Sequence, residues 1–313
     1  MGAYLLKRVV SLIPILFGIS VLVFTILHLV PGDPASIMLG TNATEESIAA
    51  LRKSMGLDQP LLTQYLTWAG GLLQGDFGVS VHSGQEILPE IVKRFSVTLQ
   101  LTLFAVLIGW IVAIPFGIIS AIRAHSKTDI AVRIATLLGI SVPNFAIGTL
   151  LLLGMSLYFG WFPPIDVVSF WEDPAEAFKV FILPATTMGI VVAAGVMRMT
   201  RSAFLETMEK DFIRTARAKG NNKWTVVMGH AFRNSSIPIV TIAGMQIGSL
   251  LGGSVIVEQL FSIPGLGQYI LEAIYQRDYP VVQGGVLFVA LVFVLVNLLI
   301  DLIYTWIDPR IKY

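Results

Sequence analysis

The sequence predicts an all-α membrane protein with six transmembrane helices. The first observation is composition: of 313 residues, 55% are hydrophobic and only 13% are charged, whereas soluble domains are typically about 25% charged. The second is that six apolar stretches are long enough to cross roughly 30 Å of hydrocarbon, which takes about 20 helical residues. These stretches lie near residues 9–30, 97–122, 132–159, 180–198, 236–260 and 281–306. The third is an uneven distribution of basic residues between them, which orients the spans across a bilayer.

The first span is predicted to be a retained N-terminal transmembrane anchor, residues 1–30. It follows Lys7 and Arg8 as a secretory signal would, but its apolar run is too long, and the Pro-Gly-Asp-Pro sequence at 31–34 is not a small-residue cleavage site. Pro143 in the third span and Pro184 in the fourth predict kinks, which neighbouring helices make tolerable in a membrane. The chain has no cysteine, which excludes disulfides and thiol chemistry.

The basic residues predict that both termini lie in the cytoplasm. With a cytoplasmic N-terminus, the even-numbered connections and the C-terminus share one side, and fifteen of the 21 Lys and Arg residues lie there. The six on the other side are Arg52, Lys53, Lys93, Arg94, Lys179 and Arg277. Because cytoplasmic loops are enriched in Lys and Arg, this distribution places the loop at 199–235 inside and the segment 31–94 outside.

Residues 31–94 are predicted to form a small helical cap on the extracytoplasmic face. Thr44 can cap a short helix that has acidic residues in its first turn and Arg52 and Lys53 in its last. Residues 61–73 supply a second amphipathic run, and the Gly-Asp-Phe-Gly sequence at 75–78 predicts a turn.

The loop at 199–235 is the candidate functional site. A run of good helix formers from Glu209 stops at Gly220 and two asparagines, which end helices and form turns, and a second helical run follows. A structured basic loop between two spans indicates a surface that another molecule grips. The candidate contact residues are Arg214, Thr215, Ala216, Arg217, Ala218, Lys219, Gly220, Arg233 and Asn234.

Two interpretations of this loop stay open on the residues alone. In the first, the small residues Ala216 and Gly220 let a partner approach the backbone closely, while Arg214, Arg217 and Lys219 offer charge to the partner's rim. In the second, the loop is a solvated basic segment held near anionic lipid headgroups.

Glu258 is a carboxylate at the outer end of the fifth span, where a charge is costly and usually faces protein or water. It precedes a predicted turn that contains Phe261, Pro264 and Gly265. Either these residues form part of a gate or translocation pathway, or Glu258 makes a buried hydrogen bond that fixes the turn.

No pattern of enzymatic chemistry is recognisable. The four histidines have no metal-ligand spacing, no base is paired with a serine, and no Gly-x4-Gly-Lys-Ser/Thr phosphate-binding loop occurs. The chain is therefore predicted to contain no catalytic residue, metal or cofactor. If ATP drives the protein, another polypeptide binds it. The net charge of +1 gives no indication of nucleic-acid binding.

The loop resembles the signature of ATP-binding-cassette (ABC) importer permeases, Glu-Ala-Ala-x-x-x-Gly-x9-Ile-x-Leu-Pro. Ala216 and Gly220 match its core, and the chain departs from it at both ends, with Arg-Thr at 214–215 and Phe-Arg at 232–233. These departures are similar to the dipeptide, oligopeptide and nickel permease branch. Four further segments resemble that branch: 29–34, 56–60, 258–267 and 308–311.

The resemblance implies a type I ABC importer permease bundle over residues 95–306, with cytoplasmic coupling helices in the loop 199–235 and a cytoplasmic tail at 307–313. It implies a bacterial inner-membrane protein that works by alternating access. Its implied partners are a homologous second permease subunit, two ABC ATPase subunits that carry ATP and Mg, and an extracytoplasmic substrate-binding protein.

The implied cargo is a di- or oligopeptide, with glutathione and nickel or metal chelates as alternatives. The rival class is an ATP-independent secondary transporter or channel. That class predicts more intramembrane charge, broken paired helices or an internal repeat, and these signals are weak in this sequence.

Overall fold

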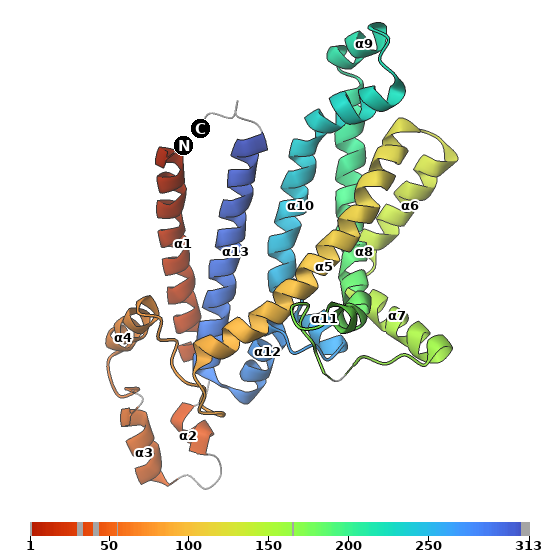
Figure 1. Ribbon diagram of the computed structural model, residues 1–313. Coiled ribbons are helices and arrows are strands. Elements are labelled where there is room, and N and C mark those ends of the chain that lie inside the picture. Colours follow the sequence, from red (N-terminus) through yellow and green to blue (C-terminus); the bar gives the residue numbers. More distant parts are fainter. Residues whose placement is uncertain (1, 30–33, 40–43, 55, 165, 308–313) are drawn as a thin grey trace. The chain divides into compact units, whose positions relative to one another are not determined.

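The computed structural model describes residues 2–29, 34–39, 44–54, 56–164 and 166–307. Within these ranges the chain is helical apart from its loops and one bridge between Val79 and Glu86 (Figure 1). It divides into two compact units, residues 1–97 with 264–294 and residues 98–263 with 295–313. The predicted all-α architecture is confirmed. The motif at 308–311 and most of the one at 29–34 lie outside the described residues.

Five helical segments are long and apolar enough to cross a membrane, and a bent pair of helices supplies a sixth span if the pair is counted as one. The five segments belong to α1 (Gly2–Leu29), α5 (Ile87–Ile122), α8 (Pro174–Met208), η2 (Thr225–Phe232) with α10 (Arg233–Gly253), and α13 (Tyr279–Ile307). The bent pair is α6 (Lys127–Ser141) and α7 (Asn144–Phe159), with 103° between the two helices. The six predicted apolar stretches therefore correspond to these six segments.

The two prolines predicted to kink spans have different effects. At Pro143 the chain leaves the helix: Val142 and Pro143 are both extended, and α7 begins at Asn144. A residue before proline is disfavoured in the helical region, which accounts for a break rather than a kink. At Pro184, in contrast, α8 continues as one helix.

In the first unit, the segment between the first two spans is helical, as predicted. Its helices are α2 (Pro34–Leu39), α3 (Glu45–Ser54) and α4 (Leu61–Leu73). Thr44 caps α3: its Oγ1 accepts a hydrogen bond from the Ser47 N–H at 3.2 Å, and the Ser47 hydroxyl accepts one from the Thr44 N–H at 3.0 Å. This reciprocal arrangement satisfies two donors at the helix start. Gly75 and Gly78 both have positive φ angles, in agreement with the predicted turn.

The first unit has its core between the start of α5, α12 (Leu266–Gln276) and the start of α13, where Ile87, Leu266 and Val281 are buried together. Asp278, before α13, is 2% exposed and accepts a hydrogen bond from the Ser80 hydroxyl at 2.6 Å. This bond ties the loop before α5 to the start of the last helix.

The core of the second unit is centred on α8, which packs against α6, α7, α10 and α11 (Val255–Leu260). Glycines let α5 approach α8 closely. A Cβ on Gly117 would lie 2.7 Å from Thr200 Cβ, and one on Gly109 would lie 2.6 Å from Val192 Cγ1. Small residues of this kind allow backbones to pack closely in membranes, where association depends on van der Waals contact.

Candidate functional site: the basic loop between α8 and α10

The first part of the loop is the amphipathic helix α9 (Asp211–Ala218). Asp211 lies in its first turn and Arg217 in its last, so both charges are favourably placed in the helix dipole. The helix ends at Ala218 with Lys219 as its C-cap, and Gly220 follows with a φ of +80°. Glycine adopts this left-handed conformation without the penalty of a Cβ. The predicted stop at Gly220 is therefore confirmed.

The two asparagines after Gly220 connect the helices. The Asn221 side-chain amide donates to the Ala216 carbonyl at 3.0 Å, which satisfies an acceptor at the end of α9. The Asn222 side-chain oxygen accepts from the Thr225 N–H at 2.7 Å and so caps the next helical run. That run passes through the π-helical segment η2 and continues into α10 without a break. The predicted second helix is thus continuous with the helix of the fifth span.

The buried face of α9 fixes the helix to its own chain. Ile213 is fully buried and Ala216 is 6% exposed, and both belong to a core cluster with Phe204, Val226 and Ala231. The small size of Ala216 therefore serves the contact between α9 and the chain's own core. Of the two small residues identified in the sequence, Gly220 is the one at the surface.

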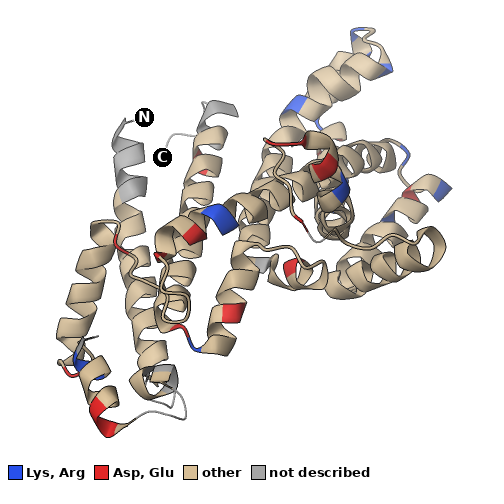
Figure 2. Ribbon diagram, turned by 60° about the horizontal axis from the view of Figure 1, so that its bottom comes forward, with Lys and Arg blue, Asp and Glu red and all other residues tan. Residues whose placement is uncertain are grey.

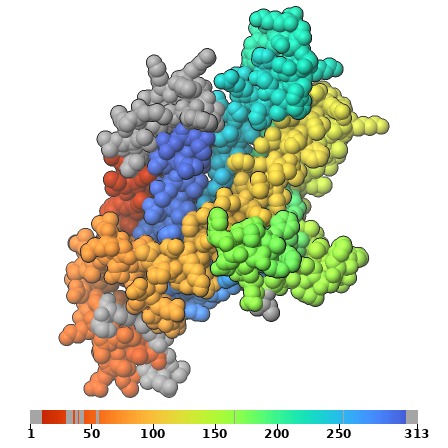
Figure 3. Space-filling model, viewed as in Figure 1, coloured from red at the N-terminus to blue at the C-terminus, as the bar shows by residue number. Residues whose placement is uncertain are grey.

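The exposed part of the loop combines basic and aromatic side chains. Arg214, Thr215, Arg217, Ala218, Lys219 and Gly220 are all exposed, as is Lys223. Among them lie Phe212, 38% exposed, and Trp224, 71% exposed. In Figure 2 the basic residues of this region gather around α9, and Figure 3 shows the segment forming a projection of the second unit.

Arg233 and Asn234 lie in the first turn of α10 and are exposed. The Asn234 side-chain amide donates to the His230 carbonyl at 2.8 Å, so it is held against its own helix. The adjacent Ser235 is buried, and its hydroxyl lies 3.0 Å from Thr207 Oγ1 on α8. Arg233 and Asn234 therefore lie at the surface, beside a contact that joins α10 to α8.

A buried ion pair lies near the same end of α8. Asp129 on α6 is fully buried, and Arg201 on α8 donates to it twice, from Nε at 2.7 Å and from Nη2 at 2.9 Å. The Ser120 hydroxyl at 2.6 Å and the His125 N–H at 3.0 Å complete the hydrogen bonds to this carboxylate. A bidentate arrangement of this kind is among the strongest polar contacts in proteins. It holds α6 to α8.

Glu258 on α11 is fully buried and accepts hydrogen bonds from the Thr98 hydroxyl at 2.8 Å and the Ser254 hydroxyl at 2.7 Å. Its carbonyl accepts from the Ile263 N–H at 2.8 Å, which closes the turn after α11. Phe261 in this turn is also buried. These contacts agree with the interpretation that Glu258 fixes the turn, and the gating role of Glu258, Phe261, Pro264 and Gly265 stays a prediction.

Two protein families match most of the chain. Residues 113–313 match the family described as binding-protein-dependent transport system inner membrane component, and residues 1–102 match the N-terminal family of the same membrane components. The chain belongs to this family. It is an ABC importer permease of the peptide and nickel branch, a multi-pass inner-membrane protein.

Curated relatives match this permease over its full length. It is 41% identical over 310 residues to the glutathione transport system permease protein GsiC of Escherichia coli strain K12, which covers 99% of each chain. It is 39% identical over 333 residues to the dipeptide transport system permease protein DppB of Alkalihalophilus pseudofirmus, covering 100% of each. A solved structure of inward-facing conformations of the MetNI methionine ABC transporter has a TM-score of 0.57 at 19% identity, over 70% of this chain and 96% of that one. This last likeness supports the fold.

Sequence reasoning missed two features of the permease's site. Phe212 and Trp224 were not recognised as surface residues. Phe212 lies four residues before the buried Ala216, at the edge of the buried face of α9, and so remains partly exposed. The pairing of Asp129 with Arg201 joins residues 72 positions apart, and no local pattern signals it. Among the described residues of the permease, no three His, Asp or Glu side chains come together as a metal site would require.

Proposed function

We propose that this permease forms half of the translocation pathway of an ATP-driven importer of small peptides, and that its loop between α8 and α10 docks onto a separate ATPase subunit. The permease relatives named for glutathione and dipeptide transport support the cargo class, because glutathione is itself a small peptide. Transport of glutathione or of unmodified di- and oligopeptides is equally supported. Nickel or metal-chelate transport is the alternative within the same machinery.

The observation that carries the docking role is the exposed aromatic pair in a basic surface. Trp224 exposes 71% of its surface and Phe212 exposes 38%, in the same loop as the exposed Arg214, Arg217 and Lys219. Aromatic and Arg side chains are enriched at the energetic centres of protein interfaces. Trp224 combines its exposure with a position in a loop whose other exposed side chains are largely basic, which is the composition of an interface centre. The exposed aromatic and basic side chains of this loop therefore favour contact with a protein partner over permanent exposure to water.

The proposed mechanism is alternating access driven from this loop. Two ATPase subunits bind ATP and Mg, close on nucleotide, and draw together the loops of this chain and of a homologous second permease subunit. A substrate-binding protein delivers cargo to the opposite face. The orientation in this proposal, with both termini and the loop 199–235 in the cytoplasm, rests on the distribution of the 21 Lys and Arg residues. This chain supplies no cofactor of its own.

The docking role is tested by replacing one tryptophan and using another as the control. Trp224→Ala removes the exposed aromatic of the loop, and Trp171→Ala removes a tryptophan that is 85% exposed in the loop before α8. Loss of an interface anchor typically weakens binding by about 2 kcal/mol, or roughly 30-fold. We expect Trp224→Ala to lose ATPase co-purification and substrate-stimulated hydrolysis in a reconstituted complex, while Trp171→Ala keeps both.

Equal behaviour of the two variants would contradict docking through this surface. Uptake by proteoliposomes that contain the permease without any ATPase would support the rival class of secondary transporter or channel. The cargo is identified separately, by the ligand that co-purifies with the cognate binding protein. A nickel or metal-chelate ligand there would overturn the peptide assignment and leave the docking role intact.

A further inference from the structure

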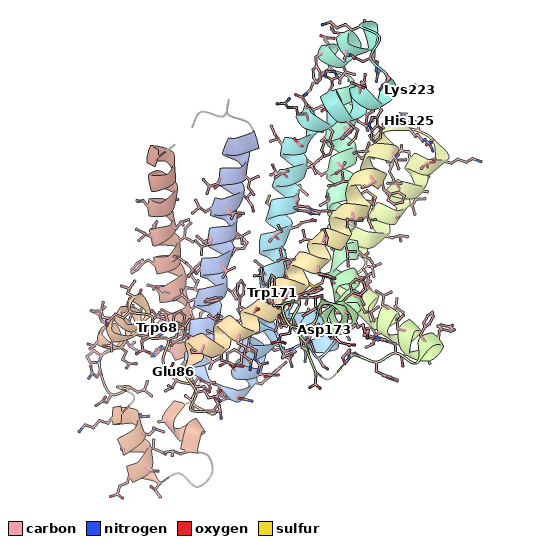
Figure 4. All side chains as sticks on the ribbon, viewed as in Figure 1. Trp68, Glu86, His125, Trp171, Asp173 and Lys223 are labelled. Atoms are coloured by element: carbon pink, nitrogen blue, oxygen red, sulfur yellow. The ribbon has the colours of Figure 1, made fainter. Side chains whose placement is uncertain are left out.

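Helix α4 packs against the middle and outer part of the first membrane span, α1. The Tyr65 hydroxyl lies 2.8 Å from Ser20 Oγ. The ring of Phe24 lies 5.4 Å from that of Tyr65 and 5.9 Å from that of Trp68, measured between centroids. His28 Nε2 lies 3.2 Å from Gln64 Oε1. Figure 4 shows Trp68, on α4, beside the C-terminal part of α1.

These contacts fix the depth of α4 in the bilayer. The apolar part of α1, Val10–Leu29, has 20 residues; at about 1.5 Å per residue it matches a hydrocarbon thickness of about 30 Å. Ser20 is therefore roughly 14 Å from the Leu29 boundary, and Phe24 roughly 8 Å from it. Because Tyr65 and Trp68 contact these two residues, their rings lie within the hydrocarbon level of α1.

The surface of α4 suits that depth. Residues 61–73 contain no Asp, Glu, Lys or Arg, and the nearest charged residues are Asp58 and Asp76. None of the helix's residues is buried by the chain itself. Four leucines project outward with large exposed fractions: Leu61 58%, Leu62 69%, Leu66 60% and Leu73 91%. An apolar patch of this kind in water would be unfavourable and marks an interaction surface.

The longest polar side chain of α4 is satisfied without water. The Gln64 side-chain amide donates to the Gln59 carbonyl at 2.8 Å and to the Leu57 carbonyl at 3.3 Å, while its oxygen faces His28. A polar group that is fully bonded within the protein can be placed in a lipid environment at low cost. The neighbouring α3 differs, since it carries Glu45, Glu46, Arg52 and Lys53.

We propose that α4 is an interfacial membrane helix, embedded beside α1 in the leaflet that contains the C-terminal end of α1, with its leucine face in contact with lipid acyl chains. The lipid that surrounds the exposed side of α1 is the occupant of this face, because the same hydrophobic belt continues from α1 onto α4. Interfacial helices lie about 5–10 Å into the boundary between headgroups and acyl chains. The level of Phe24 falls within this range, and the Tyr65 hydroxyl reaches deeper, to Ser20. The segment between the first two spans is thus divided into a membrane-embedded α4 and a water-exposed α3.

The test uses single cysteines, which the chain lacks, in the assembled transporter in vesicles of phosphatidylethanolamine and phosphatidylglycerol. Leu62→Cys and Leu66→Cys carry a nitroxide spin label. Ile26→Cys, 52% exposed on α1, is the lipid reference, and Ala50→Cys, exposed on α3, is the water reference. The measured quantity is collision of each label with oxygen, which concentrates in lipid, and with a neutral nickel chelate, which stays in water.

We expect the oxygen-to-nickel ratio at 62 and 66 to equal that at 26 and to be several-fold higher than at 50. A ratio like that at 50 would place α4 in water and overturn the proposal. Labels protected from both reagents would show that a protein surface covers the leucines, which also overturns it. Both sites are exposed, so either variant alone decides the question if the other loses uptake activity. The outcome does not depend on which cargo or which ATPase the permease serves.

Discussion

Removing Arg201 is predicted to destabilise the second unit strongly, because it leaves Asp129 buried without its counter-charge. Asp129 is fully buried and the Arg201 side chain is 22% exposed. Breaking one partner of a buried ion pair typically costs about 3–5 kcal/mol. Since water reaches part of Arg201, we expect the lower end, about 3 kcal/mol, or roughly 150-fold in the unfolding equilibrium.

A double-mutant cycle isolates the pair. Asp129→Asn removes the charge and keeps one acceptor oxygen, which can serve the Ser120 hydroxyl or the His125 N–H but not both. We expect a cost of about 1–2 kcal/mol. In the double variant Asp129→Asn with Arg201→Met, no buried charge remains, and the total loss is expected to fall below that of Arg201→Met alone. The coupling energy between the two sites should reach at least about 1 kcal/mol.

The assay is the free energy of unfolding in mixed micelles, measured by titration with a denaturing detergent. Arg198→Met is the matched control: Arg198 is exposed on α8, three residues before Arg201, and its replacement should change stability by no more than about 0.5 kcal/mol. Arg201→Met and Arg198→Met with equal stability would refute the reasoning, as would a double variant less stable than Arg201→Met.

Three further predictions concern the loop, the topology and Glu258. Gly220→Asn should keep normal stability and ATPase coupling, because Asn tolerates a φ of +80° and a Cβ there meets no atom within 4 Å. Gly220→Trp should lose ATPase coupling while its membrane insertion stays normal. Retained coupling in the Trp variant would contradict close docking at this turn. An impermeant thiol reagent applied to intact cells should label Glu45→Cys and spare Ala218→Cys, whereas equal labelling would reverse the orientation. Glu258→Leu should reduce folded protein because it removes the carboxylate that accepts from two buried hydroxyls, while Glu258→Gln should fold. A Gln variant that folds but loses uptake would indicate gating.

Local sequence patterns predicted the elements of this fold well. The capping residue Thr44, the glycine after α9 and the apolar stretches each act through neighbouring residues, so composition and spacing are sufficient to locate them. Pro143 was also recognised, but a kink and a break share the same local signal. Whether the chain resumes its direction after a proline depends on packing, and here α7 packs against α8 at 103° to α6.

The sequence predicted where the candidate site lies, but it did not predict the role of each residue in it. Ala216 and Gly220 carry the same signal, small size, yet Ala216 is packed inside and Gly220 is exposed. That difference follows from which face of α9 meets the core, which a short helix does not reveal by sequence alone. Tertiary contacts decide that difference.

The contacts of the loop also determine how a displacement of it would spread. Ile213 and Ala216 bury α9 against the core of the second unit, so α9 cannot shift without the helices beneath it. Packed interiors transmit strain because they contain little free volume. Ser235 joins α10 to α8, and the Asp129 pair with Arg201 joins α8 to α6. A force on the exposed Trp224 therefore acts on three membrane helices together. The continuous backbone hydrogen bonding of α6 ends before Pro143, so α7 is tied to this group of helices through its own packing against α8.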